Sequence, residues 1–325
     1  MRLVSFEHGH GSAGPVCDSR TRLGALVTDP DGTVRVLDLN EACPELPADM
    51  IDFLTAGEAA MALAQETVDA VDPGSLPAAD SVRLLAPVPS PGVLLGVGYN
   101  YRGHHAAGAV ETTAGPAHPD VFAKVTRSVI GPGAAVEVPS ASEEVDYEAE
   151  LAVVIGRAGR DIPESAAMEH VAGYSIVNDV SARDWQDRSS QWVLSKSFDT
   201  FAPFGPALVT ADEVQDPQDL DITLTFNGET TVRASTRDMI FTVRALVAYV
   251  SQAMTLQPGD VIATGSPQKL QQALAEPRPM RAGDLVEITI GPLGTLVTPV
   301  VDRAPSVRDP QSSPDRDPRP GAPGT

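Results

Sequence analysis

The sequence contains very little cysteine: Cys17 and Cys43 are the only two among its 325 residues. Two thiols exclude a framework of several disulfides, and they are too few to supply the four ligands of a structural zinc site by themselves. So few cysteines in a chain of this length indicate a reducing compartment, because oxidising compartments favour disulfides. We therefore expect a cytoplasmic protein.

Basic residues and long apolar runs are also scarce. There are 23 Lys and Arg against 44 Asp and Glu, which gives a formal net charge of −21. This balance argues against nucleic acid and against anionic membranes as partners, because both require clustered positive charge. No run of about 18 apolar residues is present, and residues 1–7 lack the apolar core of a signal peptide, so we expect no membrane span.

The first 88 residues predict a small N-terminal α+β domain. Residues 20–39 are typical of a hairpin, since two β-rich runs flank Asp29-Pro30-Asp31-Gly32, a strong turn sequence. Residues 47–71 carry apolar side chains at near-helical spacing and predict a helix. Prolines then interrupt the chain repeatedly between residues 73 and 91, so we place the domain boundary near residue 88.

Residues 89–303 predict a larger domain with a dominant β core. Short β-rich runs alternate with turns, and residues 241–254 are the segment most typical of a helix. The expected fold class is therefore α+β, with a β-rich mixed-sheet C-terminal domain. Residues 304–325 are rich in Pro, Ser, Asp and Arg and lack aromatic residues, which predicts a disordered tail. The expected strands are 93–97, 151–155, 220–226, 261–264 and 285–290.

Two glutamates stand two residues apart at the start of the apolar run 151–155. Side chains at i and i+2 of a strand point to the same face, so Glu148 and Glu150 should project side by side. Burying two like charges this close is costly unless a cation neutralises them. A third acid, Asp179, ends the apolar run 174–178. Three carboxylates predict a site for a hard divalent ion, the alternative being the solvated face of an edge strand.

Several motifs follow one another in order along residues 93–301. They are 98–104 (GYNYRGH), 122–124 (FAK), 146–151 (DYEAEL), 173–184 (GYSIVNDVSARD), 196–206 (KSFDTFAPFGP), 227–229 (NGE), 238–241 (DMIF), 258–262 (PGDVI) and 264–267 (TGSP). This series resembles the fumarylacetoacetate hydrolase family. The first 85 residues match loosely, as the variable N-terminal domain of such proteins.

The resemblance implies a β-rich mixed fold for the main domain and a homodimer. From the composition of residues 304–325, we expect the tail to take no part in that dimer. It implies a divalent ion, Mg²⁺ or else Mn²⁺ or Ca²⁺, held by Glu148, Glu150 and Asp179. It also implies a small anionic oxo-acid substrate, such as an acylpyruvate or another 1,3-dicarbonyl compound. Family reactions are hydrolysis of a C–C bond, decarboxylation and keto–enol isomerisation.

The resemblance assigns roles to seven further positions. Four match residues that activate water or that contact the substrate or an oxyanion, and fixed donors of this kind stabilise developing charge. We expect these four to be catalytic: His104, Lys196, Arg183 and Gln186. The other three match residues that bind the substrate carboxylate or line the same cavity: Thr264, Tyr99 and Lys124.

The sequence departs from the family pattern at the wall and the lid of the expected site. Many relatives carry a Glu three residues after the histidine, on the same helical face, where it orients the imidazole. Here that position is Ala107, so the backbone, a water or Glu111 would have to orient His104. Ser266 stands where relatives often have Thr, and Gln-Lys-Leu follows where they have a Gly-rich stretch. We expect residues 103–119 to form a lid over the substrate.

The leading interpretation is a divalent-metal-dependent hydrolase that cleaves a C–C bond in an acylpyruvate-like 2,4-dioxo acid. The metal would act as a Lewis acid and stabilise the enolate that forms when the bond breaks. The first alternative is a decarboxylase, or a keto–enol or double-bond isomerase, of an oxo-diacid on the same scaffold. The second is a non-catalytic, ligand-binding member. The missing glutamate weakens hydrolysis most, because hydrolysis depends most on an activated water.

Overall fold

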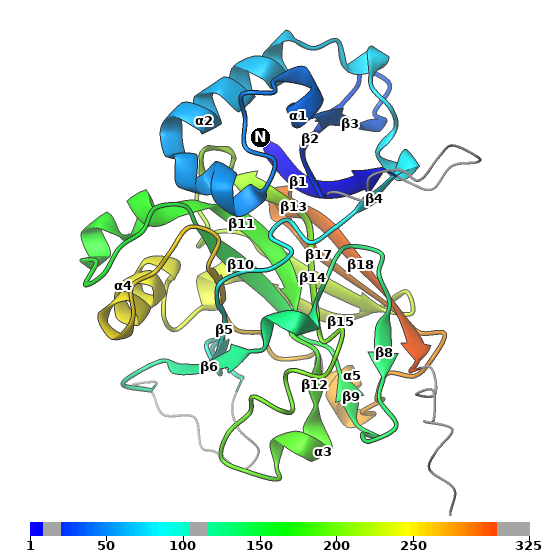
Figure 1. The fold of residues 1–325 in the computed structure, drawn as a ribbon. Helices are drawn as coiled ribbons and strands as arrows, with labels where there is room; N and C mark the ends of the chain where they lie inside the picture. Colours follow the sequence, from blue (N-terminus) through cyan, green and yellow to red (C-terminus); the bar gives the residue numbers. More distant parts are fainter. Residues whose placement is uncertain (9–20, 105–115, 304–325) are drawn as a thin grey trace, which may run out of the picture.

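Strand β10 (Ala149–Ile155) lies inside an eleven-stranded sheet and organises the fold (Figure 1). The computed structural model describes residues 1–8, 21–104 and 116–303. All seven residues of β10 are buried, as expected for a strand covered on both faces. Its odd-numbered residues pack toward a second sheet, which is formed by β14, β15, β17, β18 and β8. Ala152 and Val154 pack on the other side, into a core that includes residues of helix α2 (Met50–Ala70). The strand predicted at 151–155 is confirmed and begins two residues earlier.

The large sheet combines strands from both ends of the described chain. Strand β1 pairs antiparallel with β13, with Leu3 opposite Leu208. The sheet is therefore continuous across the boundary expected near residue 88, and the division into two domains there stays a prediction. The strand order is β3 (Val34–Asp38), β2 (Arg22–Thr28), β1 (Arg2–His8), β13 (Ala202–Thr210), β11 (Val171–Asn178), β10, β16 (Val261–Ala263), β5 (Leu94–Gly98) and β6 (Asp120–Lys124), with β4 (Val82–Leu84) beside β1 and β7 (Val129–Ile130) beside β13.

A second, five-stranded sheet packs against the first. Alternate residues of β14, namely Ile222, Leu224 and Phe226, are buried in the core between the two sheets. Parallel and antiparallel pairs occur in both sheets, so the predicted β-rich mixed α+β class is confirmed. The order is β15 (Glu229–Ser235), β14 (Asp221–Phe226), β17 (Leu285–Ile290), β18 (Gly294–Asp302) and β8 (Val136–Val138), and β12 (Ser181–Ala182) pairs separately with β9 (Val145–Asp146).

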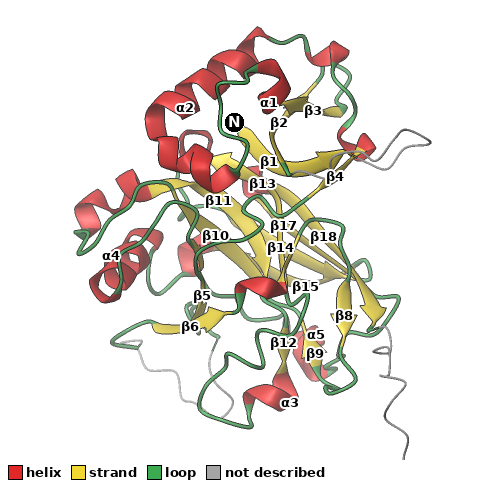
Figure 2. Cartoon of the chain, viewed as in Figure 1, coloured by secondary structure: helices red, strands yellow, loops and turns green. Residues whose placement is uncertain are grey.

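Helices are few and lie outside the sheets (Figure 2). The helix predicted at 47–71 is observed as α2 (Met50–Ala70), capped by the Asp49 carboxylate, but Gly57 adopts φ 73° and breaks it into two segments. The helix predicted at 241–254 is observed as α4 (Val243–Ala253), capped by Thr242. Within the described ranges, every helix is too short or too polar to cross a bilayer. The remaining helices are α1 (Leu39–Ala42), α3 (Arg183–Gln186) and α5 (Gln271–Ala275).

The predicted hairpin is confirmed as β2 and β3. Asp29 stabilises the turn, since its Oδ1 accepts hydrogen bonds from the amides of Asp31 and Thr33 at 3.0 and 2.9 Å. Gly32 provides the positive φ that the turn requires. Two other predictions, the tail at 304–325 and the central part of the lid at 105–115, lie outside the described residues.

Gly173 permits the close approach of β11 to β13, and its replacement tests the packing that holds the site. A Cβ at this position would lie 2.1 Å from the Val209 carbonyl oxygen, so the two strands would have to separate. We expect Gly173→Ala to lower the free energy of unfolding by about 3 kcal/mol, measured by urea denaturation. Gly74→Ala is the control, because its Cβ would lie 3.5 Å from the Asp72 Oδ1 atom. Equal stability of the two variants would contradict the packing argument.

Candidate active site and metal centre

Glu148, Glu150 and Asp179 lie together, and each offers a carboxylate oxygen within 4.8 Å of the others. Glu150 lies in β10, Glu148 immediately precedes that strand, and Asp179 immediately follows β11. The register of the two strands continues by one pair, since the Asp179 amide donates to the Glu148 carbonyl at 2.9 Å. The three carboxylates therefore converge as predicted, while binding of an ion there stays a prediction.

Glu150 is the acid of this group whose charge is least compensated. Its Oε2 accepts one hydrogen bond, from the Gly265 amide at 2.9 Å, and it forms no ion pair with any described residue. Burial raises its pKa well above the usual value, and the charges of Asp179 and Glu148 raise it further. A divalent cation would remove this repulsion, and carboxylate oxygens are the ligands that Mg²⁺, Mn²⁺ and Ca²⁺ prefer. The residues present therefore fit such an ion.

Two buried lysines contact the same acids from different sides. The Lys196 ammonium donates to Glu148 Oε2 at 2.6 Å and to Asp179 Oδ2 at 2.5 Å. The Lys124 ammonium donates to Asp179 Oδ1 at 2.5 Å and to the Val180 carbonyl at 3.1 Å. Lys196 lines the cavity that opens over the carboxylates, whereas Lys124 does not line it. Lys124 contacts the other oxygen of the Asp179 carboxylate. This differs from the cavity-lining position expected for Lys124.

The environments of the two lysines differ in charge as well as in position. Burial lowers the pKa of Lys124, and its contact with Asp179 offsets this only in part. Burial also acts to lower the pKa of Lys196, but Asp179 and Glu148 outweigh it and the pKa is raised. Lys196 is therefore a fixed positive charge beside the cavity, suited to stabilising negative charge on a substrate oxygen.

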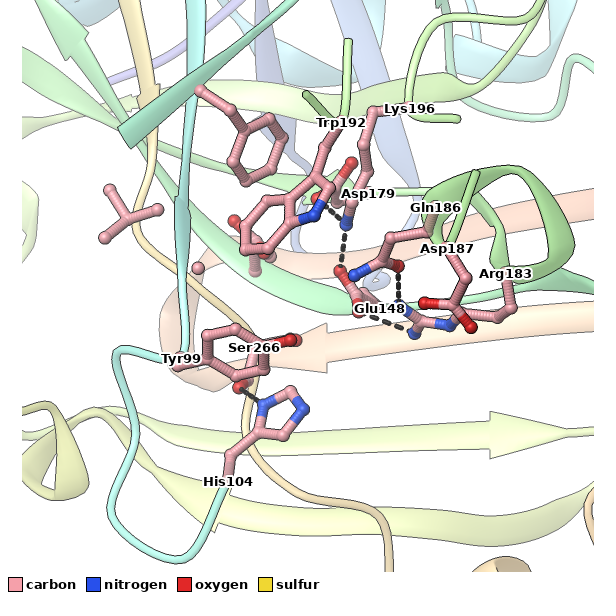
Figure 3. A pocket seen from close by; sticks show the side chains of 14 residues that line it. Tyr99, His104, Glu148, Asp179, Arg183, Gln186, Asp187, Trp192, Lys196 and Ser266 are labelled. Atoms are coloured by element: carbon pink, nitrogen blue, oxygen red, sulfur yellow. Dashed lines mark hydrogen bonds and ion pairs between the residues drawn. The ribbon is translucent and has the colours of Figure 1, made fainter. Parts of the chain in front are cut away.

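A cavity of about 220 Å³ opens over the carboxylates (Figure 3). Three aromatic side chains form part of its wall: the ring of Trp192 lies edge-on to those of Tyr99 and Phe122, at centroid distances of 5.7 and 5.5 Å. Gly98 makes room for this wall, because a Cβ there would lie 2.6 Å from the Trp192 ring. Tyr99 lines the cavity as predicted. Trp192 and Phe122 were not predicted from the sequence as site residues, although the glycines at alternate positions of β5, Gly96 and Gly98, were a signal for large neighbours.

Arg183 connects the carboxylates to a second acid outside the predicted triad. Its Nη2 donates to Glu148 Oε1 at 2.6 Å and to Asp146 Oδ2 at 2.9 Å, and its Nη1 donates to Gln186 Oε1 at 3.0 Å. Burial acts to raise the pKa of Glu148, but Arg183 and then Lys196 outweigh it and hold the pKa well below the usual value. Arg183 and Gln186 both line the cavity, and their predicted contact with the substrate or an oxyanion stays a prediction.

His104 points into the cavity and is oriented by the backbone. Its Nδ1 lies 2.7 Å from the Ser266 carbonyl oxygen (Figure 3). A carbonyl can only accept, so Nδ1 carries the hydrogen, and in the neutral ring Nε2 keeps a free lone pair. No carboxylate of a described residue hydrogen-bonds to this ring; Ala107 and Glu111 lie outside the described residues. Of the three predicted ways to orient His104, the described residues supply the backbone.

Thr264 lies beside the site without lining the cavity. Its Oγ1 donates to the Leu151 carbonyl at 3.0 Å, and its own carbonyl accepts from Asn100 Nδ2 at 2.8 Å. Its predicted contact with the substrate carboxylate stays a prediction. Asn100, for which no role was predicted from the sequence, is buried. Its Nδ2 also donates to the Phe241 carbonyl at 3.0 Å, and its Oδ1 accepts from the Phe241 amide at 2.7 Å. It thereby fixes the segment that carries Tyr99 and His104.

Comparison with known proteins identifies relatives along nearly the whole chain. The human oxaloacetate tautomerase FAHD2A, mitochondrial, is 42% identical over 303 residues, which cover 93% of this chain and 92% of that protein. This relative and its counterparts from Xenopus laevis and Rattus norvegicus are named as mitochondrial, so the cytoplasmic location expected from the sequence is wrong. Low cysteine content indicates a reducing environment, which is not a property of one compartment alone.

Solved structures share the fold. A fumarylacetoacetate hydrolase from Exiguobacterium antarcticum has a TM-score of 0.75 and 33% identity, covering 93% of this chain and 100% of that one. The maleylpyruvate hydrolase of Sphingobium sp. SYK-6, solved with manganese (II) and pyruvate, has a TM-score of 0.72 and 29% identity, covering 93% and 99%. The family model described as fumarylacetoacetate (FAA) hydrolase C-terminal matches residues 94–301. The chain therefore belongs to the fumarylacetoacetate hydrolase family, and its carboxylates, buried lysines and aromatic wall lie within the part of the chain that defines that family.

Proposed function

We propose that this protein is a divalent-metal-dependent tautomerase, which interconverts the keto and enol forms of oxaloacetate or a closely similar 2-oxo dicarboxylate. The observation that carries the proposal is the orientation of His104: its Nδ1 lies 2.7 Å from the Ser266 carbonyl oxygen, so the neutral ring presents Nε2 as the proton acceptor. Such a base suits the transfer of a proton between carbon and oxygen. The 42% identity to human oxaloacetate tautomerase supports the same reaction.

The reaction moves one proton from C3 of oxaloacetate to the oxygen on C2, and no atom is lost. His104 Nε2 accepts the proton from C3, the electron pair of that C–H bond forms the C2–C3 double bond, and the π pair of the C2 carbonyl moves to its oxygen. The same nitrogen then returns the proton to that oxygen. The Lys196 ammonium stabilises the negative charge that develops on that oxygen. Glu148, Glu150 and Asp179 would hold Mg²⁺, or else Mn²⁺ or Ca²⁺, which when bound supplies Lewis-acid polarisation of the carbonyl.

Hydrolysis of an acylpyruvate, the leading interpretation from the sequence, is the second candidate. The similarity to maleylpyruvate hydrolase favours it. Hydrolysis requires the imidazole to activate a water, and tautomerisation requires it to accept a proton from carbon, so His104 becomes an imidazolium in both reactions. The higher identity favours tautomerisation: 42% to the human oxaloacetate tautomerase against 29% to the maleylpyruvate hydrolase. We also propose that the protein forms a homodimer through residues 89–303, on the family resemblance alone.

The test supplies the purified protein with Mg²⁺ or Mn²⁺ and follows three products. Loss of ultraviolet absorbance from the enol of oxaloacetate reports tautomerisation, release of carbon dioxide reports decarboxylation, and release of a carboxylic acid from an acylpyruvate reports hydrolysis. We expect metal-dependent enol decay to be the fastest reaction. Faster acylpyruvate cleavage or carbon dioxide release would replace the tautomerase proposal with the corresponding alternative.

His104→Ala should lower the rate of tautomerisation by about 10²-fold, because it removes the base that transfers the proton. Affinity for Mn²⁺, measured by calorimetry, should stay the same, since His104 is not among the acids expected to hold the ion. His170→Ala is the matched control: its Nδ1 also contacts a backbone carbonyl, that of Arg157 at 2.9 Å, and it lines neither the main cavity nor the one beside Lys269. A His104→Ala protein with the wild-type rate would refute the assigned base.

A further inference from the structure

Lysine is rare in this chain and is placed unusually. Only three of the 23 basic residues other than histidine are lysines, and all the others are arginines. Lys124 and Lys196 contact the acids of the metal centre. The third, Lys269, pairs with Asp146, which also accepts hydrogen bonds from Arg183. All three lysines therefore lie in or beside the site, and Lys269 is the one to which no role has been assigned.

Lys269 lies at a second cavity that adjoins the first. This smaller cavity has a volume of about 190 Å³, and its lining shares His104, Glu148, Arg183 and Ser266 with the main cavity. Lys269 comes from the loop in which the sequence departs from the family pattern, and it lines the second cavity but not the first; it also borders a groove of about 740 Å³ beside Tyr147 and Phe226. A ligand bound over the carboxylates could therefore extend past Arg183 toward Lys269.

Two cations and two carboxylates line the second cavity, Arg183 and Lys269 against Asp146 and Glu148. Asp146 lies between both cations: its Oδ2 accepts from Arg183 Nε and Nη2 at 3.0 and 2.9 Å, and its Oδ1 accepts from Lys269. Glu148 is paired with Lys196 and Arg183. The carboxylate beside Lys269 is therefore shared with Arg183, and the Lys269 ammonium can attract a further anionic group at its end of the cavity.

The Lys269 ammonium is held in place, but not all of its N–H donors have a hydrogen-bond partner among the described residues. It lies 4.0 Å from the centroid of the Tyr147 ring, and the next amide, that of Leu270, donates to the Thr231 carbonyl at 2.8 Å. Its side chain is 21% exposed, and Asp146 is its only hydrogen-bond partner in the part of the chain that the structure describes. An ammonium has three donors, so two can reach a ligand.

We propose that Lys269 binds the distal carboxylate of the substrate and makes the site selective for dicarboxylates over monocarboxylates. This inference rests on the proposed oxo-acid substrate. It adds that the loop 264–270 recognises the distal carboxylate of that substrate. A structural ion pair with Asp146 alone would predict no effect of Lys269 on the choice of ligand. The two explanations therefore differ in binding selectivity, which can be measured without turnover.

The test compares malate, which has the carbon skeleton and both carboxylates of oxaloacetate, with lactate, which lacks the distal carboxylate. Calorimetry on the Mg²⁺-loaded protein should give tighter binding of malate. Lys269→Met should reduce the ratio of the two affinities by about 10- to 100-fold, the usual effect of losing a hydrogen bond between charged groups. Lys269→Arg should keep most of the preference, because the charge remains.

Arg233→Met is the matched control, since it removes one positive charge from an exposed position next to Val232, which lines the second cavity. It should keep the wild-type ratio, and all variants should keep the wild-type thermal midpoint within a few degrees. A wild-type protein that does not bind malate more tightly than lactate would overturn the proposal. So would a folded Lys269→Met protein with an unchanged ratio.

The scarcity of lysine gives a second, independent measurement. The side chains of Lys124 and Lys196 are 0% and 4% exposed, so an amine-reactive reagent should modify Lys269 first among the lysines. Malate should slow this modification, read by mass spectrometry of the peptide that carries Lys269, and lactate should not. Equal protection by both would contradict the proposal. Protection by malate in a protein that does not interconvert oxaloacetate tautomers would refute the proposed reaction and leave the dicarboxylate site standing.

Discussion

Lys196→Met is expected to lower the rate of tautomerisation by about 10³-fold or more. The Lys196 ammonium lies 2.6 Å from Glu148 Oε2 and 2.5 Å from Asp179 Oδ2 at the wall of the cavity. Loss of one donor to a developing oxyanion costs about 10²–10³ in rate, and this donor is charged and buried, which increases the cost. The rate constant at saturating oxaloacetate and Mg²⁺ measures the effect.

The same substitution should not weaken metal binding. Lys196 shares oxygens of Glu148 and Asp179 with any ion that those acids hold, so its removal takes a competing positive charge away. Calorimetry with Mn²⁺ should therefore give an affinity at least equal to that of the wild type. An inactive variant that has also lost the ion would show that Lys196 supports the metal centre and does not stabilise the substrate oxygen.

Lys124→Met is the matched comparison, because it removes a second buried ammonium that contacts the same aspartate. Lys124 contacts Asp179 Oδ1, the oxygen that Lys196 does not contact, and it does not line the cavity; its other donor contact is the Val180 carbonyl. We expect a loss of no more than about tenfold in rate, since one orienting hydrogen bond is lost and no donor to the substrate. Equal losses in the two variants would mean that the position of the ammonium does not matter.

The sequence predicted the features of the site that depend on strand geometry. Glu148 and Glu150 are two residues apart at the beginning of β10, and their shared face follows from the repeat of a strand. Their convergence with Asp179 required one further fact, the register of β10 against β11, and the ordered family motifs implied it. A period of two residues and a resemblance were therefore enough to predict the cluster of three carboxylates.

Contacts made by the backbone could not be predicted in this way. The carbonyl that orients His104 belongs to Ser266, and every residue has such a carbonyl, so the sequence contains no signal for it. The hydroxyl of Thr264 turns toward the Leu151 carbonyl for the same kind of reason. The side from which Lys124 reaches Asp179 also depends on how β6 lies beside β5, which residue spacing does not determine.

Pairing between distant segments was the other feature that could not be predicted. The hairpin of β2 and β3 is local and was predicted from its turn residues. The pairing of β1 with β13 joins residues about 200 positions apart, and the apolar character of both strands suits many partners. The expected division near residue 88 was based on prolines, which mark irregular chain but do not report whether strands on either side join one sheet.

Glu150→Gln is expected to abolish metal-dependent activity and to lower the affinity for Mn²⁺ by about 10²-fold or more, because it removes one of three charged ligands. The same change should stabilise the metal-free protein. Burial and the charges of Asp179 and Glu148 disfavour the Glu150 carboxylate in the folded state, and an amide of the same shape avoids that repulsion. We expect a gain of about 1–3 kcal/mol, seen as a rise of a few degrees in the thermal midpoint with EDTA present.

The two effects have opposite signs, and this makes the prediction specific. A residue that only supports the fold would lose stability and activity together, whereas a metal ligand held next to like charges should lose function while the metal-free fold gains stability. Addition of Mn²⁺ should then raise the thermal midpoint of the wild type but not that of the variant, since an ion stabilises only the state that binds it. Glu287→Gln in β17 of the second sheet is the control and should change neither quantity. A Glu150→Gln protein that binds Mn²⁺ as the wild type does, or that is less stable without metal, would remove Glu150 from the metal centre.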